Sequence, residues 1–176
     1  SEAMMDKPRS FYAFEMLYWC GIREGELLAL TPADFDFDKN TVSINKSYQR
    51  LNGQDLITTP KTEKSNRIIK MPQFSADEMK DYLKMLYDVG EKERMFAITK
   101  SYLHREMGRG SKEAGVKRIR IHDIRHSHVS HLIDMGFSAI ASADRVRHES
   151  IDITYNYAHL FPSKLTEMAD KLNMER

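Results

Sequence analysis

Two pairs of residues in the last third of the chain have the types and spacing to handle an oxyanion. His122 and Arg125 are three positions apart, so on a helix their side chains share one face. His148 is followed nine residues later by Tyr157, which stands in a Tyr-x-His sequence. Cationic donors gathered with a tyrosine predict a site for a negatively charged oxygen cluster, with the phenol as a nucleophile.

Two cations earlier in the chain could join such a site. Arg23 stands at the start of an expected short helix, where backbone N–H groups and an arginine together favour an anion. An ion pair with Glu26, three residues on, is the simpler interpretation of Arg23 taken alone. Lys61 lies in the polar, basic connection between two expected strands, which could reach a DNA groove or be an ordinary solvated turn.

The elements that must position these residues are mostly helices. Hydrophobic spacing and capping signals predict helices over residues 8–19, 23–30, 75–87, 101–114, 122–135 and 138–147, one from 150 that carries Tyr157, and one over 162–172. Ser75 with Glu78 is interpreted as the capping box that opens the third helix. Ser138 is interpreted as the cap of the sixth.

Short strands are predicted between the second and third helices. They cover Thr41–Ile44, Leu56–Thr59 and Arg67–Met71, with turns at Asn52-Gly53 and at residues 61–66, the second at the tip of a hairpin. The expected fold class is therefore mainly α with a small antiparallel β-sheet (α+β). We expect residues 6–176 to form a single domain and residues 1–5 to be a cloning remnant outside the fold.

Composition limits the function classes. The chain has 176 residues, 41% hydrophobic and 30% charged, which is typical of a soluble globular domain. Its net charge of +1 gives no global basic signal, so a nucleic-acid surface must come from local clusters, which occur over residues 45–70 and 104–131. One cysteine excludes an internal disulfide and fits a reducing compartment. We find no signal peptide and no apolar stretch of about 18 residues, and we expect no membrane partner.

Four ordered motifs resemble those of the catalytic domain of tyrosine recombinases, the phage and transposon integrase family. They are Gly21-Ile22-Arg23-x-x-Glu26-Leu27, then Thr59-Pro60-Lys61-Thr62 with Ser65 and Arg67, then His122-Asp123-Ile124-Arg125-His126, and finally His148-x-x-Ile151-x-x-Thr154-x-x-Tyr157-x-His159. The resemblance runs from Phe11 to Leu172, nearly the whole chain.

The resemblance implies site-specific DNA recombination, the integration or excision of a mobile element, through a 3′-phosphotyrosine intermediate. Tyr157 would be the nucleophile and Lys61 the general acid. Arg23 and Arg125 would bind the non-bridging phosphate oxygens, and His122 and His148 would donate to the phosphate or move protons. The reaction needs no cofactor and no metal, and the protein is expected to be cytoplasmic and encoded by a bacterium or a phage.

The resemblance also implies partners. Double-stranded DNA is the expected substrate, with Lys64, Arg67 and Arg120 as DNA-binding residues. Members of the family usually carry an N-terminal DNA-clamping domain, which this chain lacks. The full-length protein would form a tetramer on DNA, and the chain alone could be a monomer.

Three observations leave alternatives open. The family usually has a glycine directly before the last histidine, but here Arg147 stands there, so a DNA-binding or regulatory relative with an impaired reaction is an alternative. Tyr155 is a rival nucleophile, although on a helix it would point about 200° away from Tyr157. His122 and His126, at i and i+4, could hold zinc with His131 or His148 as in a metal-dependent hydrolase, although no glutamate follows the first histidine.

Overall fold

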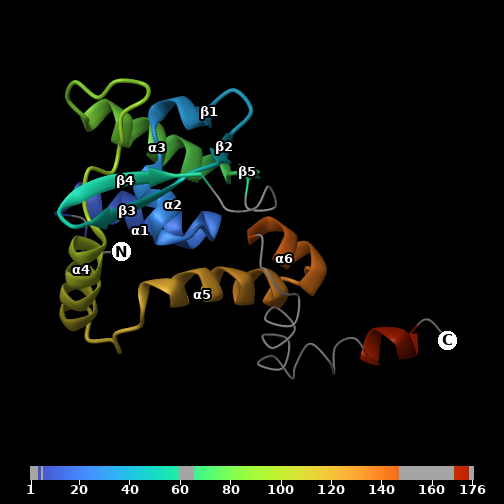
Figure 1. Ribbon diagram of the computed structural model, residues 1–176. Helices are drawn as coiled ribbons and strands as arrows, with labels where there is room; N and C mark the ends of the chain where they lie inside the picture. Colours follow the sequence, from blue (N-terminus) through green and yellow to red (C-terminus); the bar gives the residue numbers. More distant parts are fainter. Residues whose placement is uncertain (1–3, 5, 60–65, 147–168, 175–176) are drawn as a thin grey trace.

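The computed structural model describes residues 4, 6–59, 66–146 and 169–174, and it is mainly helical with small antiparallel sheets, as predicted (Figure 1). The helices are α1 (Pro8–Cys20), α2 (Glu24–Ala29), α3 (Gln73–Met85), α4 (Lys100–Glu113), α5 (Ile121–Asp134) and α6 (Ala139–Val146). The strands are β1 (Phe35–Asp36), β2 (Thr41–Ile44), β3 (Ser47–Leu51), β4 (Gln54–Thr58) and β5 (Arg67–Lys70). Among the described residues, every helix is too short or too polar to cross a membrane.

Helix α1 is central to the hydrophobic core. Pro8 occupies its first turn, where the missing N–H costs no hydrogen bond, and Gly21 ends it with φ of 65°. Ala13, Met16 and Leu17 are almost completely buried against residues from α2, α3 and the strands. Burial of such side chains is the main favourable term in folding, so α1 sets the positions of the elements around it.

The strands form two separate sheets, which corrects the predicted hairpin. The order β1-β2-β5 makes a three-stranded antiparallel sheet, with Val42 opposite Ile69 and Ile44 opposite Arg67. Strand β3 was not predicted, and it pairs with β4 through a two-residue turn. Asn52 and Gly53 both have positive φ, 50° and 75°, as a type I′ turn requires. The strands on either side of the basic segment, β4 and β5, therefore belong to different sheets in the described part of the chain, and residues 60–65 themselves lie outside it.

Helix α3 begins two residues earlier than the capping box predicted. Pro72 precedes its first residue and no side chain caps it, whereas Ser75 lies inside the helix and is fully buried. The predicted capping box is therefore wrong, because Ser75 faces the core. Thr99, by contrast, caps α4: its Oγ1 accepts a 3.2 Å hydrogen bond from the backbone N–H of Tyr102.

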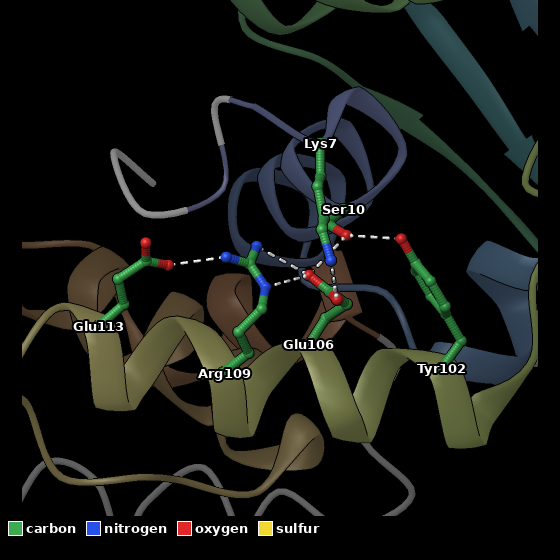
Figure 2. Close-up of polar contacts among 6 residues, drawn as sticks. All are labelled: Lys7, Ser10, Tyr102, Glu106, Arg109 and Glu113. Carbon is green, nitrogen blue, oxygen red and sulfur yellow. Dashed lines mark hydrogen bonds and ion pairs between the residues drawn. The ribbon is translucent and has the colours of Figure 1, made fainter.

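A buried carboxylate ties α4 to the first turn of α1. Glu106 accepts hydrogen bonds from Lys7 Nζ and Ser10 Oγ, both at 3.1 Å, and from Arg109 Nε at 3.0 Å (Figure 2). Ser10 Oγ also lies 3.0 Å from the hydroxyl of Tyr102 (Figure 2). Lys7 and Ser10 lie at the start of α1, so α4 cannot turn about its own axis without breaking their hydrogen bonds to Glu106.

Met4, the one described residue among the first five, also packs on α4. Its side chain is only 8% exposed, and a Cβ added at Gly110 would lie 2.7 Å from Met4 Cε. Gly110 therefore allows the close approach of Met4.

Candidate active site

The structure brings three of the predicted catalytic residues to one pocket. Arg23, His122 and Arg125 line a cavity of about 230 Å³, together with Ile22, Glu24, Gly25, Ser47, Lys100 and Ile121. Arg23 lies at the start of α2, and His122 and Arg125 lie in the first turns of α5, so two helix starts meet there. A water molecule in the liquid takes about 30 Å³, so the cavity has room for a phosphodiester group.

Arg23 is oriented by Glu26, as the ion-pair interpretation predicted. Its backbone N–H donates to Glu26 Oε1 at 2.8 Å, and its Nη1 lies 3.9 Å from Glu26 Oε2. About a third of the Arg23 side chain is exposed, so the guanidinium keeps access to the pocket. The two interpretations of Arg23 are therefore compatible, because the carboxylate holds the start of α2 while the arginine lines the cavity.

Arg67 is engaged inside the protein, which argues against its predicted DNA contact. Its Nη1 and Nη2 donate to Glu26 at 2.8 and 3.0 Å, and its side chain is 2% exposed. A DNA phosphate could not reach a guanidinium buried in this way without breaking the pair. Arg67 thus fixes the carboxylate that in turn holds Arg23, and its contact with DNA stays a prediction.

Burial and charge act in opposite directions on Glu26. Burial alone raises the pKa of this carboxyl, but the hydrogen bonds and charge of Arg67, with the backbone N–H and charge of Arg23, outweigh it. The pKa of Glu26 is therefore held below its usual value, and the carboxylate is ionised at neutral pH.

Arg125 is the largest of the fully buried side chains among the described residues. Its Nη1 donates to the carbonyl oxygen of Gly21 at 2.7 Å, and its Nη2 donates to that of Val146. Its Nε is also buried and has no hydrogen-bond partner among the described residues. Burial first, and then the charges of Arg23 and Arg67, lower the pKa of Arg125 to about 9, so it stays protonated at neutral pH.

Gly21 is required by this arrangement. Its φ of 65° favours glycine, and a Cβ there would lie 2.5 Å from Cδ2 of His128 and 2.8 Å from Cγ1 of Val146. Gly25 has a similar role, because a Cβ there would lie 2.4 Å from Ser47 Oγ. Glycine thus lets α5, α6 and β3 approach the helix starts that carry the pocket.

His122 is a neutral donor or acceptor at the rim of the pocket. Partial burial lowers its pKa below 6.5, and the charges of Arg125 and Arg23 lower it further. Its ring meets that of His126 edge to face, with the centroids 4.6 Å apart. At neutral pH this imidazole can therefore take or give a proton without an initial charge.

Arg145 connects α6 to three other elements. Its Nη2 donates to the carbonyl of Trp19 at 3.1 Å, its Nη1 to that of Lys70 at 2.9 Å, and its Nε to Nε2 of His128 at 3.1 Å. Burial first, and then the charge of Arg145, lower the pKa of His128 to about 4, which keeps this acceptor neutral. The end of α6, which directly precedes residue 147, is thereby fixed to the body of the domain.

Several predicted residues lie outside the described part of the chain: Lys61, Lys64, Arg147, His148, Tyr155 and Tyr157. Arg120 is described, and it is highly exposed next to Asp123, to which it donates at 3.1 and 3.3 Å. Its position at the start of α5 leaves a DNA contact as a prediction.

Sequence reasoning missed two residues of the pocket. Ser47 comes from β3, a strand without a sequence signal, and Lys100 is the first residue of α4, which was expected to begin at residue 101. The signal that could have found Lys100 was Thr99, a good N-cap residue one position earlier.

The histidine-zinc alternative gains no third ligand in the described residues. His131, one of the candidates, has its Nδ1 3.0 Å from the hydroxyl of Tyr18. Within the described ranges, no group of three or more His, Cys, Asp or Glu side chains could hold a metal ion. The pair of His122 and His126 stands beside Arg125, whose positive charge disfavours a cation there.

Comparisons with known proteins bear on the family and the fold. The chain is 33% identical to the ICEBs1 integrase of Bacillus subtilis (strain 168), in an alignment that covers 94% of this chain and 48% of that protein. It is 25% identical to a putative prophage phiRv2 integrase of Mycobacterium tuberculosis, over 98% of this chain and 48% of the relative. The chain thus spans about half the length of these relatives.

Among solved structures, the Tn1549 transposon integrase in complex with circular intermediate DNA superposes with a TM-score of 0.78. That match has 23% identity and covers 88% of this chain and 57% of the other, and it shows a common fold. The sequence model of the phage integrase family matches residues 2–164, which include all four motifs. The chain therefore belongs to the phage integrase family.

Proposed function

We propose that this chain is the catalytic domain of a tyrosine recombinase that integrates or excises a mobile element by cutting and rejoining DNA. The observation that carries the proposal is the pocket where Arg23, His122 and Arg125 meet. Among its described lining residues Glu24 carries the one carboxylate, which lies 3.1 Å from Nε2 of His104. A cationic, phosphate-sized cavity of this kind suits a group with negative non-bridging oxygens.

In the first step, the phenolic oxygen of Tyr157 attacks a backbone phosphorus of DNA. The Tyr157 O–P bond forms while the bond from phosphorus to the 5′-oxygen breaks. The phenol loses its proton, and the departing 5′-oxygen gains one and leaves as a hydroxyl. Since the phosphotyrosine ester retains the energy of the broken diester, the reverse attack by a 5′-hydroxyl rejoins DNA without a nucleotide cofactor.

The described residues would stabilise the negative charge that develops on the phosphoryl group during the reaction. Arg125 and Arg23 are planar donors suited to two non-bridging oxygens, and the buried position of Arg125 makes its charge strong because little water screens it. His122 is neutral at rest and donates to the phosphate or relays a proton. Lys61 as general acid and His148 as a second imidazole complete the set, on the motifs alone.

The hydrogen bonds of Arg125 describe how it would be held for this task. Each Nη atom donates one hydrogen bond to a carbonyl oxygen, and Nε has no partner within the described residues. Binding of a phosphate would give that donor a partner or exchange one carbonyl for a phosphate oxygen. One of these carbonyls belongs to Val146, so its exchange for a phosphate oxygen would change a hydrogen bond at the end of α6.

For the whole protein we propose double-stranded DNA as the partner, with a tetramer on paired sites. The DNA-contact candidates are Lys64 and Arg120. The chain alone would bind DNA weakly and would lose affinity as salt rises, because phosphate contacts release counterions. We also propose that the reaction is independent of metal and that the protein acts in the cytoplasm.

A covalent trap tests the proposal. A duplex from the element's attachment site, nicked so that the 5′-hydroxyl fragment diffuses away after cleavage, should accumulate a protein–DNA adduct. The adduct should be lost in Tyr157→Phe, remain in Tyr155→Phe and form in excess EDTA. An adduct that survives Tyr157→Phe would refute the assigned nucleophile. Absence of an adduct with the natural chain, together with its presence in Arg147→Gly, would instead support the regulatory relative.

A further inference from the structure

Lys100 is a cation of the pocket to which none of the roles above assigns a task. It is the first residue of α4 and is half-buried, and it lines the same cavity as Arg23, His122 and Arg125. Within the described ranges its ammonium has no hydrogen bond or ion pair. The neighbouring carboxylate of Glu24 is 3.1 Å from His104.

The charge of Lys100 is unfavourable in its surroundings. The start of an α-helix carries a partial positive charge and favours anions, so a lysine at the first position has the wrong sign. Arg23 and Arg125 line the same cavity and add like charges. A half-buried lysine among two arginines at a helix start is the kind of local conflict that marks a functional site, because a bound anion would resolve it.

A second observation points to the same anion. Arg125 is 1% exposed, and its Nε lacks a partner among the described residues although it is buried. Buried donors of a charged group are rarely left unsatisfied, so an acceptor is expected in the occupied state. Two residues that line the cavity from different helices, Arg125 and Lys100, thus each carry a cationic donor with no partner among the described residues.

We propose that Lys100 binds a non-bridging oxygen of the same DNA phosphate as Arg23 and Arg125. Lys100 then belongs to the catalytic residues, as a fixed cation that stabilises the charge developing on phosphorus. This inference rests on the proposed function, and it adds a phosphate-binding residue outside the four motifs.

The fixed position of Lys100 distinguishes its task from that of Lys61. Thr99 caps α4, and the Glu106 cluster locks the helix against α1 (Figure 2). Since the Lys100 backbone is held in place, its ammonium is suited to stabilise phosphate charge in both steps. The general acid must follow the leaving 5′-oxygen, and that task stays with Lys61.

The test compares two forms of the nicked duplex. One has a normal scissile phosphate, and the other has a methylphosphonate there, in which a neutral methyl replaces one non-bridging oxygen. On the normal duplex, Lys100→Ala should form the adduct about 10²-fold more slowly, in the range found when one donor to a developing oxyanion is removed. On the methylphosphonate isomer whose methyl replaces the oxygen that Lys100 binds, the ratio of wild-type to variant rates should shrink towards one, because that oxygen is gone.

Matched variants make the result specific. Lys100→Arg should restore most of the rate, and Lys84→Ala, an exposed lysine on α3 away from the pocket, should leave it unchanged. An unchanged rate in Lys100→Ala would overturn the proposal. It would also be overturned if the ratio collapsed only when the methylphosphonate occupied a neighbouring phosphate, because Lys100 would then be a DNA-positioning residue.

Failure of the proposed function gives a different pattern. In that case wild type and Tyr157→Phe behave alike, and no variant is informative about rate. The salt dependence of affinity for a random-sequence duplex then tests whether Lys100 binds a phosphate. Lys100→Ala should reduce the slope of log affinity against log salt by about 0.9, the value for one lost phosphate contact. An unchanged slope would overturn phosphate binding by Lys100.

Discussion

The carboxylate of Glu26 accepts hydrogen bonds from Nη1 and Nη2 of Arg67, at 2.8 and 3.0 Å, in a nearly water-free environment. The same carboxylate accepts the backbone N–H of Arg23. The acidic residue of the first motif therefore acts on Arg23, the proposed catalytic arginine, from inside the protein. The pair joins β5 to α2. Its loss would therefore disturb α2 and, through it, the position of Arg23 in the pocket.

Loss of one partner of this pair should strongly destabilise the domain. Glu26→Gln removes the carboxylate charge that pairs with the buried Arg67 guanidinium, which should lower the free energy of unfolding by about 3–5 kcal/mol. Chemical denaturation with urea measures this. The double variant Glu26→Leu with Arg67→Met should recover much of the loss, because no charge stays buried. Glu113→Gln, which breaks an exposed pair with Arg109, is the matched control and should change stability little.

The pair should also make stability depend on pH in a defined window. The pKa of Glu26 is lower in the folded than in the unfolded chain, whose ordinary value is 4.5. Its contribution is therefore complete above about pH 4.5 and is lost as pH falls through the folded pKa. Unfolding measured from pH 6 downward should show this loss in wild type and not in Glu26→Gln. Parallel curves would contradict it.

Glu78 should have the opposite effect. Burial first, and then the nearby carboxylates of Glu15 and Asp81, raise its pKa to about 7. The folded chain thus holds a proton that the unfolded chain releases near pH 4.5, so stability falls as pH rises from there to about 7. Glu78→Gln mimics the neutral acid and should raise Tm at pH 8, with little effect at pH 4. Glu91→Gln, in an exposed loop, should show no such pH dependence.

Much of the fold followed from local signals. Helix α1 was predicted because Pro8 starts it and Gly21 ends it, and β2 was placed at its observed bounds. The capping box at Ser75 failed because Pro72 already sets the start of α3, and the competing use of Ser75 is burial in the core. Strand β3 was missed because Ser47-Tyr48-Gln49-Arg50-Leu51 has few apolar residues and pairs with β4 alone.

The site was predicted in outline by motif order, since Arg23, His122 and Arg125 do line one pocket. The role of Arg67 was missed because ion pairing with Glu26, 41 residues away in sequence, depends on how β5 packs beside α2. Lys100 was missed for the same reason. A lone lysine has no spacing signal, and only the packing of α4 beside α5 brings it to the pocket.

Arg145 should prove to be a positioning residue. Its hydrogen bonds to Trp19, Lys70 and His128 hold α6. Hydrogen bonds from a charged group contribute about 1.5–3 kcal/mol each, so Arg145→Ala should cost about 2 kcal/mol or more. Amide hydrogen exchange should become faster in α6 more than in α3. The rate of adduct formation should fall, whereas the affinity for random-sequence DNA should stay unchanged. Arg145→Lys should rescue part of the rate. Arg9→Ala, an exposed arginine on α1, should change neither.

The pKa of His122 reports directly on the charges of the pocket. Partial burial lowers it, and Arg125 and Arg23 lower it further. Arg23→Ala removes one of these charges, so the pKa of His122 should rise towards 6.5, whereas Lys84→Ala should not move it. Titration of the imidazole by NMR measures both. Binding of a short duplex should raise the pKa too, because a phosphate between the arginines offsets their charge. If neither Arg23→Ala nor DNA changed the pKa of His122, this imidazole would lie outside the electrostatic influence of the pocket. The proposed phosphate site would then lose His122 as a member.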